Sequence, residues 1–329
     1  MLAKIPNGGA ADADPVWIDL LNPTAEEKAA VEAAIGMPLP TQADIEEIES
    51  SSRVYLEDGA FHLSTPILTG SDCVRDQPTN IGFILTPRKL VTQRFAPSRA
   101  FDALAKSYAR VPQPNASDAF LRVLEMIVDE TADALEHASA ELESISHEAF
   151  ETERPSRVRH RDMSGALRAT LRKLGRMSDG LSHLRDTLLG IGRIAAFVHE
   201  NKLKSAAGTA PAAAPDASVA APADGPARLA AIRGDITSLN DYQAHLASKV
   251  QFLLDATLGF ISIQQNDIVK TLTVVSVVGV PPVLIAGIYG MNFRVMPELN
   301  WHLGYPFALA LIVVSALVPL GWLKWRGWM

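Results

Sequence analysis

Residues 271–293 form a continuous run that contains no aspartate, glutamate, lysine or arginine. A helix needs about twenty apolar residues to cross the hydrocarbon layer of a membrane, so this run is long enough to span it. A second charge-free run, residues 303–323, follows after a short polar break. The two runs predict a pair of transmembrane helices, the first at about residues 268–290, behind a large polar N-terminal part.

Basic residues flank the two runs on one side of the predicted membrane. Lys249 and Lys270 precede the first run, Lys324 and Arg326 follow the second, and the connecting loop holds one basic residue, Arg294. By the positive-inside rule, both termini are expected in the cytoplasm and the loop outside, in a cell (inner) membrane protein that crosses the bilayer twice. The opening MLAKIPNGG lacks the apolar core of a signal peptide, in agreement with this orientation.

The overall composition narrows the function classes. At 329 residues the chain is too long for one ordinary domain. A net charge of -7 argues against a nucleic-acid partner, which requires clustered lysine and arginine, and suits a protein that gathers cations. Cys73 is the only cysteine, so no intrachain disulfide forms. No glycine-rich phosphate loop or nucleophile elbow is present, so we expect no enzyme and no catalytic cofactor.

Residues 16–110 have the pattern of a small α/β unit. Asn22 is the expected N-cap of a first helix that begins at Pro23 and ends near Gly36, and Thr41 is the expected N-cap of a second helix. Apolar runs bounded by turn residues predict strands. The predicted strands are 16–20, 53–57, 61–68, 81–86 and 89–95, with a hairpin turn at Asp58-Gly59 between the second and the third.

Helical spacing begins at Asp118 and predicts two long helices. The segment from Asp118 to Glu153 is strongly acidic, whereas the segment from Arg154 to Lys204 is basic, with Pro155 at the break. Two such helices with a tight turn are expected to pack antiparallel. Helix faces that are exposed to water already account for most of these charges, so the charges alone do not indicate a functional site. The Ala/Pro-rich residues 205–226 then predict a disordered connector, followed by one long helix from about Ala227 to Tyr289.

Seven residues with helical spacing fall on one face of this long helix, and we call them the polar stripe. They are Asp255, Ser262, Asn266, Val269, Thr273, Ser276 and Val280. Polar side chains within a span are costly against lipid, so the stripe predicts contact with water or with another helix. Ordinary helix packing is the alternative. Because two spans cannot enclose a pore, a pore requires a ring of subunits around the stripe.

Asn292, at the outer end of the first run, has a chemical use in such a pore. Mg²⁺ gives up its water reluctantly, and carboxamide oxygens accept hydrogen bonds from metal-bound water without trapping the ion. Gly290 allows a tight backbone turn beside it. Val269, Leu272 and Val280 are expected apolar constrictions that gate by excluding water.

The sequence resembles the CorA family of divalent-cation transporters in three motifs. These are Tyr289-Gly290-Met291-Asn292-Phe293, Met296-Pro297-Glu298-Leu299 and Gly304-Tyr305-Pro306. The resemblance covers residues 251–328 closely and the preceding part from Trp17 more loosely. It implies a funnel-shaped homopentamer with an α+β cytoplasmic domain, a long α-helical stalk and two C-terminal transmembrane helices. Transport would be passive.

The resemblance also implies roles for individual residues. Gly290, Met291 and Asn292 would form the outer selectivity filter, with Glu298 as the external-loop acid. Asp255 and Asn266 would form inner rings of the pore, Val269 and Leu272 the gate, and Thr273 and Val280 the wall further along. Asn292, through the hydrated ion, and Asp255 would contact the metal. Mg²⁺ would be both substrate and regulatory ligand, with Asp235 a candidate regulatory residue.

These expectations divide the chain into seven parts. They are a cytoplasmic α/β domain at 1–115, an antiparallel helix hairpin at 116–204, the connector at 205–226, the stalk and first span at 227–290, the external loop at 291–302, the second span at 303–323 and a cytoplasmic tail at 324–329.

Two alternatives remain open at this stage. The ZntB branch shares the scaffold and carries Zn²⁺, and His302 in the loop is compatible with it, although zinc sites need several nitrogen or sulfur ligands. The residues of the Tyr289–Phe293 and Met296–Leu299 motifs favour Mg²⁺ as the transported ion, with Co²⁺ and Ni²⁺ as secondary ions. The other alternative is a membrane-anchored scaffold or enzyme without transport, for which the pairs His137/Glu141 and His183/Asp179 could imitate a site.

Overall fold

The computed structural model describes residues 2–5, 15–108, 115–151, 163–206, 225–291 and 301–328. The chain forms two compact units, Met1–Leu254 and Asp255–Met329, and each is described by itself. The helix α7 (Gly225–Tyr289) contributes its first part to the N-terminal unit and the remainder to the C-terminal unit.

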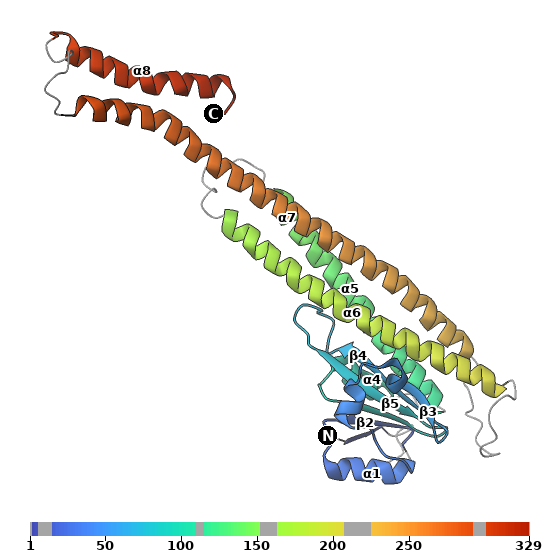
Figure 1. Ribbon diagram of the computed structural model, residues 1–329. Helices are drawn as coiled ribbons and strands as arrows, with labels where there is room; N and C mark the ends of the chain where they lie inside the picture. Colours follow the sequence, from blue (N-terminus) through green and yellow to red (C-terminus); the bar gives the residue numbers. More distant parts are fainter. Residues whose placement is uncertain are drawn as a thin grey trace. The chain divides into compact units, whose positions relative to one another are not determined.

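The N-terminal unit contains a six-stranded sheet with the order β1-β2-β6-β5-β4-β3 (Figure 1). The strands are β1 (Leu2–Ile5), β2 (Trp17–Leu21), β3 (Val54–Glu57), β4 (Ala60–Leu68), β5 (Pro78–Leu85) and β6 (Leu90–Arg94). The β2 and β6 strands pair in parallel, and every other neighbouring pair is antiparallel. The predicted strands are therefore confirmed, including the hairpin turn at Asp58-Gly59, where both residues have positive φ.

The first two helices begin at capping boxes. Helix α1 (Ala25–Ile35) begins after Thr24, whose side chain accepts a hydrogen bond from the Glu27 N–H, and ends at Gly36 with φ 77°. The prediction of Asn22 as the N-cap was wrong. Asn22 lies at the end of β2 with φ 44°, and it donates its N–H to the Arg94 carbonyl. The Thr24–Glu27 pair satisfies two helix-end donors at once, and Asn22 could not supply both of those bonds.

The second capping box lies at Thr41 and Asp44, before α2 (Gln42–Glu46), as predicted. Two further short helices complete this part of the chain. They are α3 (Ser50–Arg53) and α4 (Arg99–Tyr108).

Each face of the sheet is covered by its own apolar core. Ile18, Leu20, Ile84 and Val91 on one face pack with Val31 of α1. The other face supplies residues such as Trp17, Phe83 and Leu90, which pack with the first half of α5 (Ala116–Glu151) and the second half of α6 (Met163–Ala206).

Close packing of α6 on the sheet is visible at Gly190. A Cβ on that residue would lie 2.0 Å from Thr65 Oγ1, so the helix can approach β4 this closely only with glycine there.

Helices α5, α6 and the first part of α7 pack side by side (Figure 1). The salt bridges Glu125–Arg228 and Glu143–Lys249 show that α5 and α7 run parallel, because both residue numbers rise together. The pair Glu148–Lys173 joins the end of α5 to the start of α6, and the first half of α5 shares a core with the second half of α6, so these two helices are antiparallel, as predicted. The predicted connector was too long at both ends, because residues 205 and 206 belong to α6 and residues 225 and 226 belong to α7. Pro155 and the rest of the connector lie outside the described residues.

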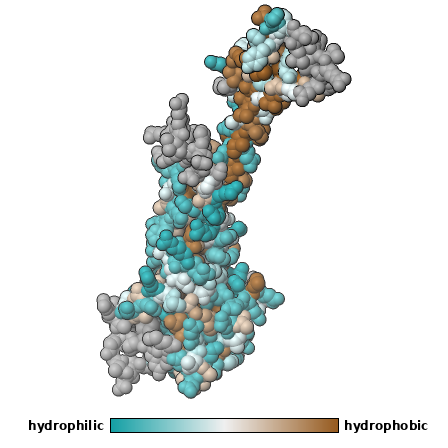
Figure 2. Space-filling view, turned by 90° about the vertical axis from the view of Figure 1, so that its left-hand side faces the viewer, coloured by the Kyte–Doolittle hydropathy of each residue, from teal (hydrophilic) through white to brown (hydrophobic). Residues whose placement is uncertain are grey.

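The C-terminal unit consists of the end of α7 and of α8 (Gly304–Trp325). Both helices are long and apolar enough to cross a membrane. Their apolar side chains are largely exposed, and Figure 2 shows this apolar surface in brown on the C-terminal helices. Pro281 and Pro282 lie inside α7. Within the described residues of the C-terminal unit, little of this apolar surface is therefore buried by the unit itself.

Candidate functional site

Helix α7 presents different faces to α8 and to the surroundings. The half-buried positions at its end are Thr273, Val274, Val278, Pro281, Pro282, Ile285 and Tyr289, and apart from Thr273 they recur on one face. The half-buried or buried positions of α8 between 308 and 323 follow the same helical spacing, so these two faces pack together. Ser276 and Val280 each lie two positions from Val278, about 200° around the helix. This part of the polar stripe is thus on the side of α7 that α8 does not cover, whereas Asn266, Val269 and Thr273 line a cavity together with the residues that follow α8.

Most of the polar stripe is exposed in the single chain. Asp255, Ser262, Asn266, Val269, Ser276 and Val280 are all exposed, as is Leu272, whereas Thr273 is half-buried at the edge of the α8 contact. The Thr273 hydroxyl donates a hydrogen bond to the Val269 carbonyl at 2.8 Å, which satisfies its proton within the helix. Asp255 makes a further polar contact of its own. An uncovered line of small polar and β-branched side chains is available to water or to other copies of the chain.

The predicted filter lies at the end of α7. The Gly290 N–H donates to the Ala286 carbonyl at 2.9 Å, and the Met291 N–H donates to the Ile288 carbonyl at 3.2 Å, so the helix ends within this motif. A Cβ at Gly290 would lie 3.1 Å from the Ala286 carbonyl oxygen, which favours glycine at this position. Asn292 and Glu298 lie outside the described residues.

A cavity of about 390 Å³ in the N-terminal unit is lined by acidic side chains of α5, with Ser71, Arg122 and three apolar residues. The acids are Glu125, Asp129, Glu130 and Asp133. Burial, followed by the charges of Asp76 and Asp133, raises the pKa of Glu130 to about 7. The pKa of Asp129 is raised as well, by burial and by Glu125, Asp133 and Asp235. Burial is the larger cause of both raised pKa values, and the charges of the neighbouring carboxylates add to it.

The start of α7 borders the acidic cavity. Arg228 donates two hydrogen bonds to the Glu125 carboxylate, at 2.8 and 2.7 Å, and also bonds Asp118. These charged partners raise the pKa of Arg228 and fix α7 against α5. Asp235, two helical turns further on, is exposed and lies near enough to Asp129 to raise its pKa. The structure thus brings the candidate regulatory residue beside the acids of α5.

A second cavity, of about 460 Å³, lies within the C-terminal unit where the charge-free runs begin and end. Lys270 of α7 and Arg326, Gly327 and Trp328 after α8 line it, together with Asn266, Val269 and Thr273 of the polar stripe. No acidic side chain is among the lining residues. This cavity combines two positive charges with an aromatic ring.

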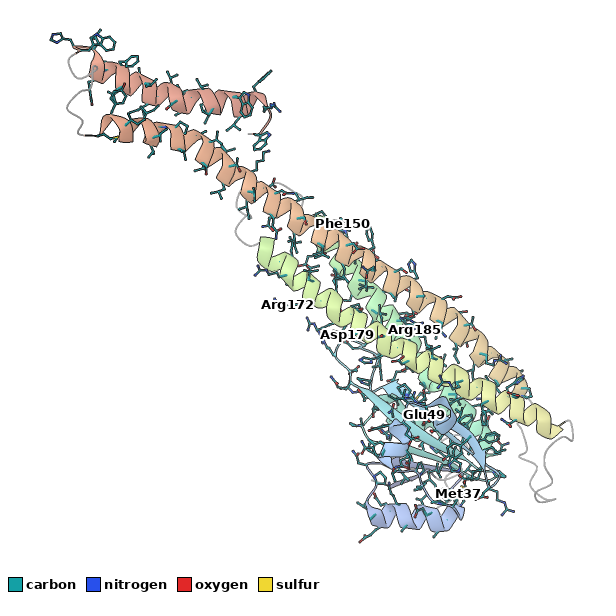
Figure 3. All side chains as sticks on the ribbon, in the orientation of Figure 1. Met37, Glu49, Phe150, Arg172, Asp179 and Arg185 are labelled. Carbon is teal, nitrogen blue, oxygen red and sulfur yellow. The ribbon has the colours of Figure 1, made fainter. Side chains whose placement is uncertain are left out.

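The histidine pairs do not form a metal site. His137 Nδ1 lies 3.0 Å from the Ser71 carbonyl oxygen, which makes it a contact between α5 and the β4–β5 loop. Asp179 is exposed on α6, with Arg172 and Arg185 on the same helix (Figure 3). Among the described residues, no group of three or more histidine, cysteine or acidic side chains could hold a metal ion.

Neither cavity was predicted from the sequence, although some of the lining residues of each have a recognisable pattern in it. Glu125, Asp129 and Asp133 are spaced four apart, which places them on one face of α5. The sequence alone assigned them to a solvated surface, because it could not show that Asp235 lies opposite. Lys270 and Arg326 were recognised as membrane-flanking charges, but their convergence with Trp328 depends on how α8 packs against α7.

The fold and these surfaces define a class of protein: a polar α/β domain with a helical bundle, followed by two membrane-spanning helices, one of which carries an uncovered polar stripe. The family model "CorA-like Mg2+ transporter protein" matches residues 12–325. The chain therefore belongs to the CorA-like family.

Individual relatives support the same assignment. The chain is 29% identical over 317 residues to "Magnesium transport protein CorA" of Pasteurella multocida, covering 95% of this chain and 92% of that one. The solved structure of the CorA magnesium transporter from Methanocaldococcus jannaschii matches with a TM-score of 0.72 at 19% identity, over 97% of this chain and 93% of that one. The ZntB cytoplasmic domain from Vibrio parahaemolyticus matches less well, with a TM-score of 0.50 at 12% identity, over 75% of this chain and 87% of that domain.

Proposed function

We propose that this chain is a subunit of a homo-oligomeric channel, most simply a homopentamer, that conducts Mg²⁺ passively across the inner membrane. Membership of the CorA-like family supports the class of function, and the magnesium-transport relatives support Mg²⁺ over Zn²⁺ as the cargo. The observation that carries the proposal is the polar stripe of α7, most of which is exposed in the single chain and which α8 leaves uncovered at Ser276 and Val280. Co²⁺ and Ni²⁺ are the expected secondary ions.

Around a common axis, the polar stripe of each copy would form stacked rings. Asp255 and Asn266 would attract the hydrated cation at the cytoplasmic mouth, and Val269, Leu272 and Val280 would form apolar rings that exclude water in the closed state. Thr273 and Ser276 would offer hydroxyl oxygens between these rings. At the outer end, Gly290, Met291 and Asn292 would form the filter, in which the Asn292 carboxamide oxygens accept hydrogen bonds from the water around Mg²⁺.

The filter assignment is tested by Asn292→Ala in proteoliposomes that contain a Mg²⁺-sensitive dye. Uptake is expected to fall to the level of protein-free vesicles, while the oligomer seen by size-exclusion chromatography is unchanged. Asn300→Ala changes the same residue type nearby in the chain and is the matched control, with normal uptake expected. Normal uptake in Asn292→Ala would remove Asn292 from the conduction path, and no uptake by the unmodified protein would favour the anchored scaffold.

We also propose that cytoplasmic Mg²⁺ closes the channel by binding at the acidic cavity of α5 and at Asp235. The four acids that line this cavity support the role, because a divalent cation would reduce the repulsion between carboxylates, which contributes after burial to the raised pKa values of Glu130 and Asp129. The acids of one chain do not form a complete metal site within the described residues, so the ion would lie between neighbouring subunits. Asp235→Asn is expected to raise the internal Mg²⁺ concentration needed to stop uptake, whereas Asp241→Asn, an exposed acid on the same helix, is expected to leave it unchanged.

A further inference from the structure

The end of α8 is built so that the chain turns back over the last helical turn. Gly327 has φ 73°, a left-handed conformation that favours glycine. Its N–H donates to the Lys324 carbonyl at 3.1 Å, and the Trp328 N–H donates to the Leu323 carbonyl at 3.0 Å. This pair of hydrogen bonds is a Schellman motif, which ends a helix in a defined geometry. Trp328 is therefore fixed against the cavity of about 460 Å³ by the backbone itself.

Two positive charges from different helices meet at this cavity. Lys270 is the last charged residue before the charge-free run of α7, and Arg326 follows the charge-free run of α8. The Arg326 guanidinium lies over the Trp322 ring, 5.3 Å from its centroid, an interaction that orients the group and leaves its N–H donors available. Neither Lys270 nor Arg326 has a salt-bridge partner among the described residues.

The surroundings of the cavity are those of a membrane–water interface. Trp322, Trp325 and Trp328 are all exposed, and tryptophan gathers at the level of lipid headgroups. Both spans change from apolar to charged residues at this point, so phospholipid phosphates are expected at the same depth. Basic pockets between transmembrane helices are suited to anionic lipid headgroups.

We infer that the cavity bounded by Lys270, Arg326 and Trp328 binds the headgroup of an anionic phospholipid. Lys270 and Arg326 would donate hydrogen bonds to the phosphate, and Trp328 would pack against the glycerol backbone. Asn266 and Thr273 line the same cavity, so the bound phosphate would neutralise two positive charges beside the polar stripe. A cation at the cytoplasmic mouth would then meet less repulsion, and this consequence rests on the proposed function.

The test is native mass spectrometry of the full-length chain, purified in detergent and exposed to mixed phosphatidylglycerol and phosphatidylcholine. The unmodified protein is expected to retain phosphatidylglycerol selectively. The double variant Lys270→Gln/Arg326→Gln should bind it roughly 30-fold more weakly, the loss expected for two basic residues near a membrane surface. The charge-preserving variant Lys270→Arg/Arg326→Lys should retain most of the binding.

Lys324→Gln is the matched control, because Lys324 lies at the same end of α8 but does not line the cavity. The inference would be overturned by equal retention of both lipids, by an unchanged double variant, or by an equal loss in Lys324→Gln. Displacement of the lipid by inorganic phosphate would instead assign the cavity to a free anion. If the unmodified protein retained no lipid and the double variant changed the distribution of oligomers, the cavity would instead be a contact with a neighbouring copy of the chain.

Mg²⁺ uptake by the same preparation separates this inference from the proposed function. Uptake without selective lipid retention would overturn the lipid site alone, and selective retention without uptake would overturn the transport proposal alone. In vesicles, phosphatidylglycerol should raise the uptake rate of the unmodified protein and of Lys324→Gln. The double variant should lose that dependence, whereas an equal lipid dependence in all three proteins would contradict the neutralising role.

Discussion

The two units of this chain share one helix, but one unit buries its apolar residues and the other exposes them. In the N-terminal unit, α7 buries Leu229, Ile232 and Ile236 against α5, α6 and the sheet. In the C-terminal unit, the same helix exposes Leu272 by 66% and Val283 by 72%. A helix with one apolar face is stabilised by a protein core, whereas one that is apolar on all sides requires lipid or other copies around it. The point along α7 at which buried apolar residues give way to exposed ones thus marks where the surroundings of the helix change from a protein core to lipid or other copies.

Charged residues show the same contrast. Asp19 and Arg94 form a salt bridge at 2.8 Å in which both side chains are 4% exposed, and Thr92 and Asp102 complete the network. In the C-terminal unit, Lys270, Lys324 and Arg326 lie at the ends of the apolar runs and are exposed. The N-terminal unit therefore depends on buried internal contacts, and the C-terminal unit depends on what surrounds it.

The largest expected effect on stability is that of Asp19→Asn. The substitution leaves the buried Arg94 guanidinium with Asp102 as its remaining carboxylate partner, so the N-terminal unit should lose about 3–5 kcal/mol of unfolding free energy. Amide hydrogen exchange in β2 and β6 measures this loss. Asp179→Asn on the exposed face of α6 is the control and should change the free energy by less than about 0.5 kcal/mol. Equal effects would show that the network does not support the sheet.

Leucine truncation in each unit sharpens the comparison directly. Leu124 is fully buried between α5 and the sheet, so Leu124→Ala should cost about 2–4 kcal/mol in the same exchange measurement. Leu272→Ala should leave exchange in the N-terminal unit unchanged, because it removes no buried contact in the described chain. If Leu272→Ala destabilised the β-strands as much as Leu124→Ala, the two units would not be energetically separate.

A third effect is a pH dependence that belongs to Glu130. Its pKa in the folded protein is about 7, above the ordinary 4.5, so the folded state holds a proton that the unfolded state releases between these values. This group therefore makes the unfolding free energy fall as the pH rises from about 4.5 to about 7, with no further change above. Glu130→Gln should remove that slope in denaturant titrations. Glu136→Gln, on the exposed side of α5, should keep it, and an equal slope in both variants would contradict the assignment.

Local signals explain which parts of the fold could be predicted from the sequence. Gly36, Thr41 and Asp58-Gly59 act within four residues of themselves, and the structure confirms each of them. The prediction of Asn22 as the N-cap was wrong because Asn22 and Thr24, only two positions apart, can both cap a helix. The Glu three positions after Thr24 was the deciding signal, and it was visible in the sequence.

Contacts between distant segments explain what could not be predicted. The parallel pairing of β2 with β6 joins Trp17 to Leu90, and no local pattern specifies that partner. Likewise, Arg228 meets Glu125 across more than a hundred residues. For the candidate site, the spacing of the polar stripe could be read from the sequence, but the side of α7 that α8 covers could not. The pore-lining and filter roles stay predictions.

The central claim is that the uncovered face of α7 lines a water-filled path shared by several copies. Cysteine accessibility tests it most directly, because the native Cys73 is buried and burial raises the pKa of its thiol to about 11, which makes it unreactive at neutral pH. Ser276→Cys lies on the polar stripe, and Val278→Cys lies on the face toward α8. A charged, water-soluble thiol reagent should label Ser276→Cys and block Mg²⁺ uptake, but should leave Val278→Cys unlabelled and active. Labelling of Val278→Cys with protection of Ser276→Cys would contradict the account.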